Sequence, residues 1–115
     1  VMARESEKAV LTLKKLTELQ DGGEAWMRMA QIHVENAEWS EAQEAISNAL
    51  KKDLESPGRA WLLLGIAQSE LGKFSDARSA LRRAQAFEDT ARSAKAWMRY
   101  SEDMKRQAEW ITSNQ

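Results

Sequence analysis

The sequence predicts an all-α fold: an α-solenoid of antiparallel helix pairs, about six helices in all, closed by a C-terminal capping helix. Two copies of one pattern recur at an offset of 35 residues, and units of roughly 20 to 50 residues are typical of stacked helical repeats. No stretch alternates apolar and polar residues with β-branched enrichment, so we expect no strands. The matched positions are Trp26, Ala30, Trp39, Ala42, Ile46 and Ala49, then Trp61, Gly65, Phe74, Ala77, Leu81 and Ala84.

Glycine and proline mark the joints between the expected helices. The Asp-Gly-Gly sequence at residues 21–23 ends the first helix, and Gly72 ends the fourth as a left-handed residue. The fourth helix begins after Ser56, whose side chain is expected to cap it, with Pro57 at the first helical position. The expected helices cover residues 4–19, 24–36, 39 or 40 to 52, 57–71, 75–87 and 90–112.

The first and last helices are assigned from their apolar faces. Ala9, Leu13 and Leu16 have the spacing of the second helix of a pair, which indicates the tail of a preceding partial repeat. Trp97 and Tyr100 begin a stripe like that of a first helix, with charged residues on the outer faces that a terminal cap needs. The expected parts of this single domain are residues 1–21 for the partial repeat, 23–55 and 56–89 for two repeats, and 90–115 for the capping helix.

Small residues recur where the paired helices would cross. Ala30 and Gly65 lie in the first helix of each pair, and Ala42 and Ala77 lie in the second. Small side chains at such crossings let two helices approach closely. We therefore assign these positions to the scaffold rather than to a functional site.

Two motifs of the second copy carry a family resemblance. They are the run Trp61-Leu62-Leu63-Leu64-Gly65 and the run Gly72-Lys73-Phe74-Ser75-Asp76-Ala77, followed by Leu81 and Ala84. Together they resemble the tetratricopeptide repeat, a helix–turn–helix unit usually about 34 residues long. Both copies here are one residue longer and lack a proline at the end of the second helix. The resemblance implies a protein-interaction scaffold.

A second, narrower resemblance covers about the last 60 residues. Residues 56–68 and 93–100 are similar to the end of tetratricopeptide-repeat proteins associated with bacterial TonB energy-transduction systems. This resemblance implies a periplasmic setting in a Gram-negative bacterium. It also implies a partner within an envelope transport complex.

Composition argues against several function classes. With 17 basic and 18 acidic residues the net charge is −1, so we expect no nucleic-acid partner. Cysteine is absent and no apolar run is long enough for a membrane span, so we expect neither thiolate chemistry nor membrane insertion. His33 is the sole histidine, which leaves no metal site or catalytic triad to assemble. We therefore expect no enzyme activity, no metal and no cofactor.

The family resemblance implies a concave groove lined by the first helices. Positions one and five after each leading tryptophan face this groove in the family, and arginines lie beside them here. An apolar strip with methionines and arginines suits a peptide or an amphipathic helix of a partner protein. The candidate partner-binding residues are Met27, Arg28, Gln31, Arg59, Leu62, Leu63, Ile66, Met98, Arg99 and Glu102.

Two alternatives stay open at this point. In the first, the C-terminal helix or preceding repeats cover the groove residues, so that no partner protein can reach them. In the other, the chain is a structural or self-association segment of a larger repeat protein, with Val10, Leu13 and Leu16 of the first helix pairing with a second copy in a homodimer.

Overall fold

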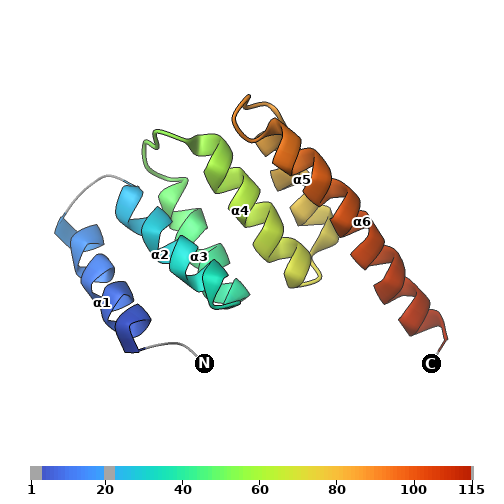
Figure 1. Cartoon of the computed structure of the whole chain (residues 1–115), viewed down its shortest axis with the longest axis horizontal. Coiled ribbons are helices and arrows are strands. Elements are labelled where there is room, and N and C mark those ends of the chain that lie inside the picture. The colour runs from blue at the N-terminus through green and yellow to red at the C-terminus, as the bar shows by residue number, and fades with distance from the viewer. Residues whose placement is uncertain (1–3, 20–22, 115) are drawn as a thin grey trace.

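The computed structural model describes residues 4–19 and 23–114, and within them the chain forms helices and no strands. The all-α prediction and its six helices are confirmed for this part of the chain. Figure 1 shows the helices stacked side by side along the longest axis. They are α1 (Arg4–Leu19), α2 (Glu24–Glu35), α3 (Trp39–Ala49), α4 (Pro57–Glu70), α5 (Phe74–Gln85) and α6 (Ala91–Ser113).

The stack is built from pairs of neighbouring helices. α2 packs on α3 and α4 packs on α5, while α1 packs on α2 and α6 packs on α5. α4 also contacts both α2 and α6, so these three helices form one face, with α3 and α5 behind them in Figure 1. The face of α2, α4 and α6 is therefore the inner face expected for the first helices of the repeats.

One apolar core runs through the stack. Its buried members come from α2, α3, α4 and α5, and Val10 of α1 and Trp97 of α6 pack against it from the two ends. Burying apolar area of this kind is the main stabilising contribution to a helical stack. The buried members are Met29, Ala30, Ala45, Ile46, Ala60, Leu63, Leu64, Ile66 and Ala80.

The paired helices cross at the small residues that the sequence analysis identified. Ala30, Ala42 and Ala77 are each 0% exposed. A Cβ atom built on Gly65 would lie 2.5 Å from Cγ of Leu81, so the Leu81 side chain of α5 fills the space that a side chain at residue 65 would need. The predicted close approach at this crossing is confirmed.

Both helical hairpins turn through the same backbone motif. After α4, the amide of Lys73 donates to the carbonyl oxygen of Gln68 (2.8 Å), and Gly72 has a φ of +77°. After α2, the amide of Glu38 donates to the carbonyl oxygen of His33 (2.8 Å), with Ala37 at a φ of +56°. This is the Schellman arrangement, which needs a left-handed residue just past the helix. The left-handed role predicted for Gly72 is confirmed, and alanine fills it in the first hairpin.

Two of the second helices end earlier than predicted. α3 ends at Ala49 rather than at residue 52, and α5 ends at Gln85 rather than at residue 87. Beyond these ends, backbone amides donate to carbonyl oxygens three residues back, as in Lys52 to Ala49 (3.0 Å) and Phe87 to Ala84 (3.3 Å). Such bonds belong to a tighter, 3₁₀-type turn. They occupy carbonyl oxygens that would accept hydrogen bonds from later amides if the α-helix continued.

The prediction that the Ser56 side chain caps α4 is wrong, because the hydroxyl makes no capping hydrogen bond. A capping hydroxyl would accept a hydrogen bond from the backbone amide of Arg59. This amide donates instead to the carbonyl oxygen of Ser56 (3.1 Å). Pro57 does stand in the first turn, as predicted, where its missing N–H leaves no donor unsatisfied.

Exchanging the two turn residues tests the strain in the first hairpin. A left-handed backbone costs a residue with a Cβ about 1–2 kcal/mol, against roughly 0.5–1 kcal/mol of extra chain entropy for glycine. We expect Ala37→Gly to raise the free energy of unfolding by up to about 1 kcal/mol and Gly72→Ala to lower it by a similar amount. Because a Cβ on Gly72 meets nothing within 4 Å, the second change reports backbone strain alone. Urea unfolding followed by circular dichroism measures both, and equal effects in the same direction would contradict this assignment.

Gly65 offers a test of the helix crossing. Gly65→Ala places a Cβ against Cγ and Cδ2 of Leu81, so we expect it to lower the free energy of unfolding by about 1–3 kcal/mol. Adding Leu81→Ile reproduces the Ala30–Ile46 combination of the first copy and should restore part of the loss. Thermal unfolding of the two variants checks this, and an unchanged midpoint for Gly65→Ala would refute the close contact.

Candidate functional site

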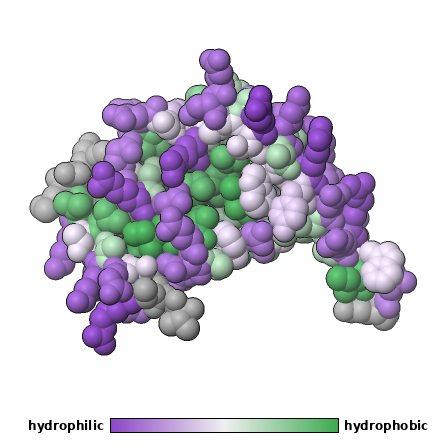
Figure 2. Space-filling view, viewed as in Figure 1, coloured by the Kyte–Doolittle hydropathy of each residue, from purple (hydrophilic) through white to green (hydrophobic). Residues whose placement is uncertain are grey.

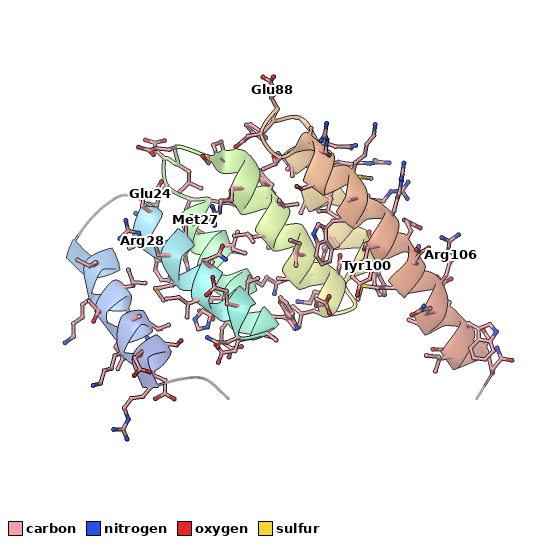
Figure 3. All side chains as sticks on the ribbon, in the orientation of Figure 1. Glu24, Met27, Arg28, Glu88, Tyr100 and Arg106 are labelled. Carbon is pink, nitrogen blue, oxygen red and sulfur yellow. The ribbon has the colours of Figure 1, made fainter. Side chains whose placement is uncertain are left out.

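A depression between α2 and α4 gathers four of the predicted partner-binding residues. Met27, Arg28 and Gln31 line it from α2, and Arg59 lines it from the start of α4. Its volume is about 270 Å³, and residues Glu24, Leu54, Glu55 and Ser56 complete its wall. Glu24, Met27 and Arg28 are labelled in Figure 3, on the first half of α2.

Polar contacts join the walls of this depression. Arg59 Nη2 donates to Oε1 of Gln31 (2.8 Å), and Gln31 Nε2 donates to Oε1 of Glu35 (3.0 Å). On the other side, the backbone amide of Glu55 donates to Oε1 of Glu24 (3.4 Å). These bonds are solvent-exposed, so each stabilises the fold little, but together they fix the orientation of the polar groups in the wall.

A second depression lies between α4 and α6. Arg59, Leu62 and Leu63 line it from α4, and Asp89, Thr90 and Ser93 line it from the start of α6 and the loop before it, with a volume of about 390 Å³. Ser56 and Arg59 belong to both depressions. The two depressions therefore meet at the N-terminal end of α4. We call this combined surface the inner groove.

The apolar residues of the inner groove differ in how much surface they offer. Leu62 and Met27 are half-buried, whereas Leu63 and Ile66 are only 8% and 9% exposed and belong to the core cluster. Figure 2 shows hydrophobic residues over α2 and α4 set among hydrophilic ones. Of the predicted strip, Met27 and Leu62 are thus the apolar side chains with area left for a partner, and Ile66 serves mainly the core.

Three predicted residues lie away from the inner groove. Met98, Arg99 and Glu102 line a separate depression on α6, together with Asp103 and Arg106. Figure 3 shows the labelled Arg106 pointing away from α4. The corresponding positions of α2 and α4 face the next inner helix, and no helix of the described chain follows α6 on that side. The structure therefore does not bring these three residues together with Met27 or Leu62.

Several residues of this face lie outside the set predicted from the sequence. Leu54, Glu55 and Asp89 come from loops, where no helical period can indicate which way a side chain points. Tyr100 packs edge-on against Trp97, with ring centroids 5.0 Å apart, yet it is 50% exposed. In Figure 3 the labelled Tyr100 lies on the side of α6 that faces α4. Tyr100 could have been predicted as a residue of this face, because it belongs to the apolar stripe of α6.

His33 has a structural environment. It is 8% exposed, and its Nδ1 lies 2.9 Å from Oε1 of Glu38, so the pair joins the end of α2 to the residue that precedes α3. Within the part of the chain that the structure describes, no three His, Cys, Asp or Glu side chains come together as a metal site would require. His33 thus supports the first hairpin turn.

The face of α1 proposed for self-association is partly used within the chain. Val10 and Leu13 are half-buried and pack against the core, whereas Leu11, on another face, is 61% exposed. The homodimer through α1 stays a prediction.

Comparison with known protein families gives a match over most of the stack. A family model described as tetratricopeptide repeat matches residues 27–94, which run from α2 to the first turn of α6. No curated protein and no solved structure matches the chain. None of the helices in residues 4–19 and 23–114 has the length and apolar character to cross a bilayer.

The different burial of Leu62 and Ile66 gives a prediction about stability. Ile66→Glu places a carboxylate among core side chains, so we expect it to lower the free energy of unfolding by about 3 kcal/mol or more. Leu62→Glu can keep its carboxylate in water and should cost about 1 kcal/mol or less. Urea unfolding of the two single variants measures the difference. Equal losses would show that Leu62 is as deeply packed as Ile66.

Proposed function

Because the chain belongs to the tetratricopeptide repeat family, we propose that it binds a peptide or a helix of a partner protein in the inner groove. Repeats of this family generally mediate protein–protein interaction. The observation that carries the proposal is the meeting of two depressions at Arg59, with the partly exposed apolar side chains of Met27 and Leu62 on either side. Flexible methionine and leucine side chains adapt to apolar residues of a bound segment.

The charges of the inner groove indicate the chemistry of the bound segment. Glu24, Glu55 and Asp89 carry negative charge and Arg28 and Arg59 carry positive charge, all within the two depressions. A groove with both signs gives little long-range attraction, so specificity would come from local hydrogen bonds and apolar contacts. An amphipathic helix or an extended peptide with apolar anchors and mixed charges fits such a surface best.

Other expectations about function rest on the family or on the sequence alone. The family generally acts as a non-enzymatic scaffold, and the absence of catalysis in this chain is part of our proposal. An assembly of the bacterial envelope, of the TonB type, stays a prediction from the narrower resemblance over residues 56–68 and 93–100. The structural or self-association role stays the alternative to partner binding.

Peptide selection can test the inner groove without knowledge of the natural partner. Random peptides displayed on phage are selected against the full chain, and the affinity of each selected peptide is measured by fluorescence anisotropy. Leu62→Glu should weaken peptides that use the groove about tenfold or more, because a buried apolar contact is replaced by a charge. A photo-crosslinking residue placed at Met27 should label the same peptides.

The matched control for this experiment is Leu11→Glu, which changes an exposed leucine of α1 in the same way. It should leave every affinity unchanged. Selected peptides that bind wild-type protein and Leu62→Glu equally, and that escape crosslinking at Met27, would refute the inner groove as the site. Retained helicity of both variants, seen by circular dichroism, excludes unfolding as the cause of a loss.

A further inference from the structure

A second surface lies between α5 and α6, and its charged residues are all basic. Arg82 of α5 and Arg92 and Lys95 of α6 line an open depression of about 620 Å³, whose remaining wall is Gln85, Ala86 and Ala91. Arg99 follows Lys95 by four residues and therefore lies on the same side of α6. Figure 3 shows nitrogen-tipped side chains gathered along the outer side of the first half of this helix. We call Arg82, Arg92, Lys95 and Arg99 the cationic surface.

The four side chains of the cationic surface form no ion pair with a carboxylate of the described residues. All four side chains are exposed. Like charges three or four residues apart on a helix, as in Arg92, Lys95 and Arg99, destabilise it by a few tenths of a kcal/mol per pair. The second half of α6 instead mixes both signs, as in the contact of Arg106 with Asp103. Solubility alone would be served by that mixed pattern, so the cationic surface calls for another explanation.

The cationic surface is also unsuited to stacking another inner helix. Leu62, Leu63 and Ile66 of α4 face α6 or the core, whereas the corresponding positions of α6 hold Met98, Arg99 and Glu102. An inner helix packed there would take the charged groups of Arg99 and Glu102 out of water, which costs free energy even when opposite charges are near. This side of α6 is therefore built to face water or a polar partner.

Acidic residues limit the cationic surface at both ends. Glu88 precedes α6, and Glu102 and Asp103 follow Arg99 within one turn. Figure 3 shows the labelled Glu88 at the tip of the loop before α6. From Arg92 to Arg99 the helix rises about 10 Å, which is the length of about three residues of extended peptide. The available space thus matches a short anionic segment.

We propose that Arg82, Arg92, Lys95 and Arg99 bind a short acidic segment of a partner protein, about three to four Asp or Glu residues long. Guanidinium groups hold carboxylates through paired hydrogen bonds, and arginines from two helices can hold successive carboxylates from two sides. This site is separate from the inner groove, so either can fail without the other.

The limiting carboxylates favour a peptide over other polyanions. A nucleic acid or an anionic membrane presents charge well beyond 10 Å, so its phosphates would meet Glu88 at one end and Glu102 and Asp103 at the other. The net charge of −1 adds no long-range attraction for such partners. A short acidic segment avoids this repulsion.

Binding of a defined acidic peptide tests the proposal. The probe is a fluorescein-labelled peptide with about four consecutive glutamates between glycine and serine residues, and its control has glutamine in their place. Fluorescence anisotropy with the full chain should show binding of the glutamate peptide only. The affinity should fall as salt rises from about 0.05 M to about 0.3 M, because exposed charge pairs are screened. Equal binding of the two peptides would overturn the proposal.

Charge reversals locate the site. The double variant Arg92→Glu with Lys95→Glu should weaken the glutamate peptide about tenfold or more, since attractive pairs become repulsive ones. The control Lys8→Glu with Lys51→Glu changes the net charge equally on exposed residues of the first half of the chain and should leave the affinity within about twofold.

Further results of these binding experiments show whether the cationic surface is the site and whether a peptide is its ligand. An equal loss of affinity in the Lys8 and Lys51 control would overturn the site. Tighter binding of single-stranded RNA, or of phosphatidylserine vesicles, than of the glutamate peptide would overturn the choice of a peptide. Leu62→Glu should leave glutamate-peptide binding intact, which separates this result from failure of the inner groove.

Discussion

The close crossing of helices within each pair is the constraint on which the rest of the structure depends. Ala30 and Ala42 are fully buried at the first crossing, and Gly65 meets Leu81 at the second with no room for a Cβ. Because the paired helices approach so closely, α2 and α4 come side by side on one face. The two depressions of the inner groove lie between these neighbouring inner helices and between α4 and α6.

The two hairpins reach the same geometry with different residues. Gly72 takes the left-handed conformation in one turn and Ala37 takes it in the other, with the same pair of backbone hydrogen bonds around each. Since the turn fixes how each second helix returns, equal turns keep the two repeats in register despite their different sequences. His33 and Glu38 add a side-chain contact to the first turn. The strain at Ala37 is thus tolerated where the surrounding contacts define the turn.

The two proposed surfaces share α6 but point in different directions. Ser93 lines the inner groove and Arg92 lines the cationic surface, and neighbouring residues on a helix point about 100° apart. The inner groove carries charges of both signs, whereas the charged side chains of the cationic surface have one sign. Different classes of segment are therefore expected on the two sides, and one occupant need not displace the other.

Sequence alone determined the six helices, the repeat and the small residues at the crossings, because these follow from local spacing and from the backbone freedom of residues such as Gly72. It also identified Met27 and Arg59, which the structure brings into one depression. Only the tertiary structure decided that Ile66 is buried and that Met98 lies off the inner groove. Periodicity gives the direction of a side chain from its own helix, whereas its depth depends on neighbours that other helices and loops supply.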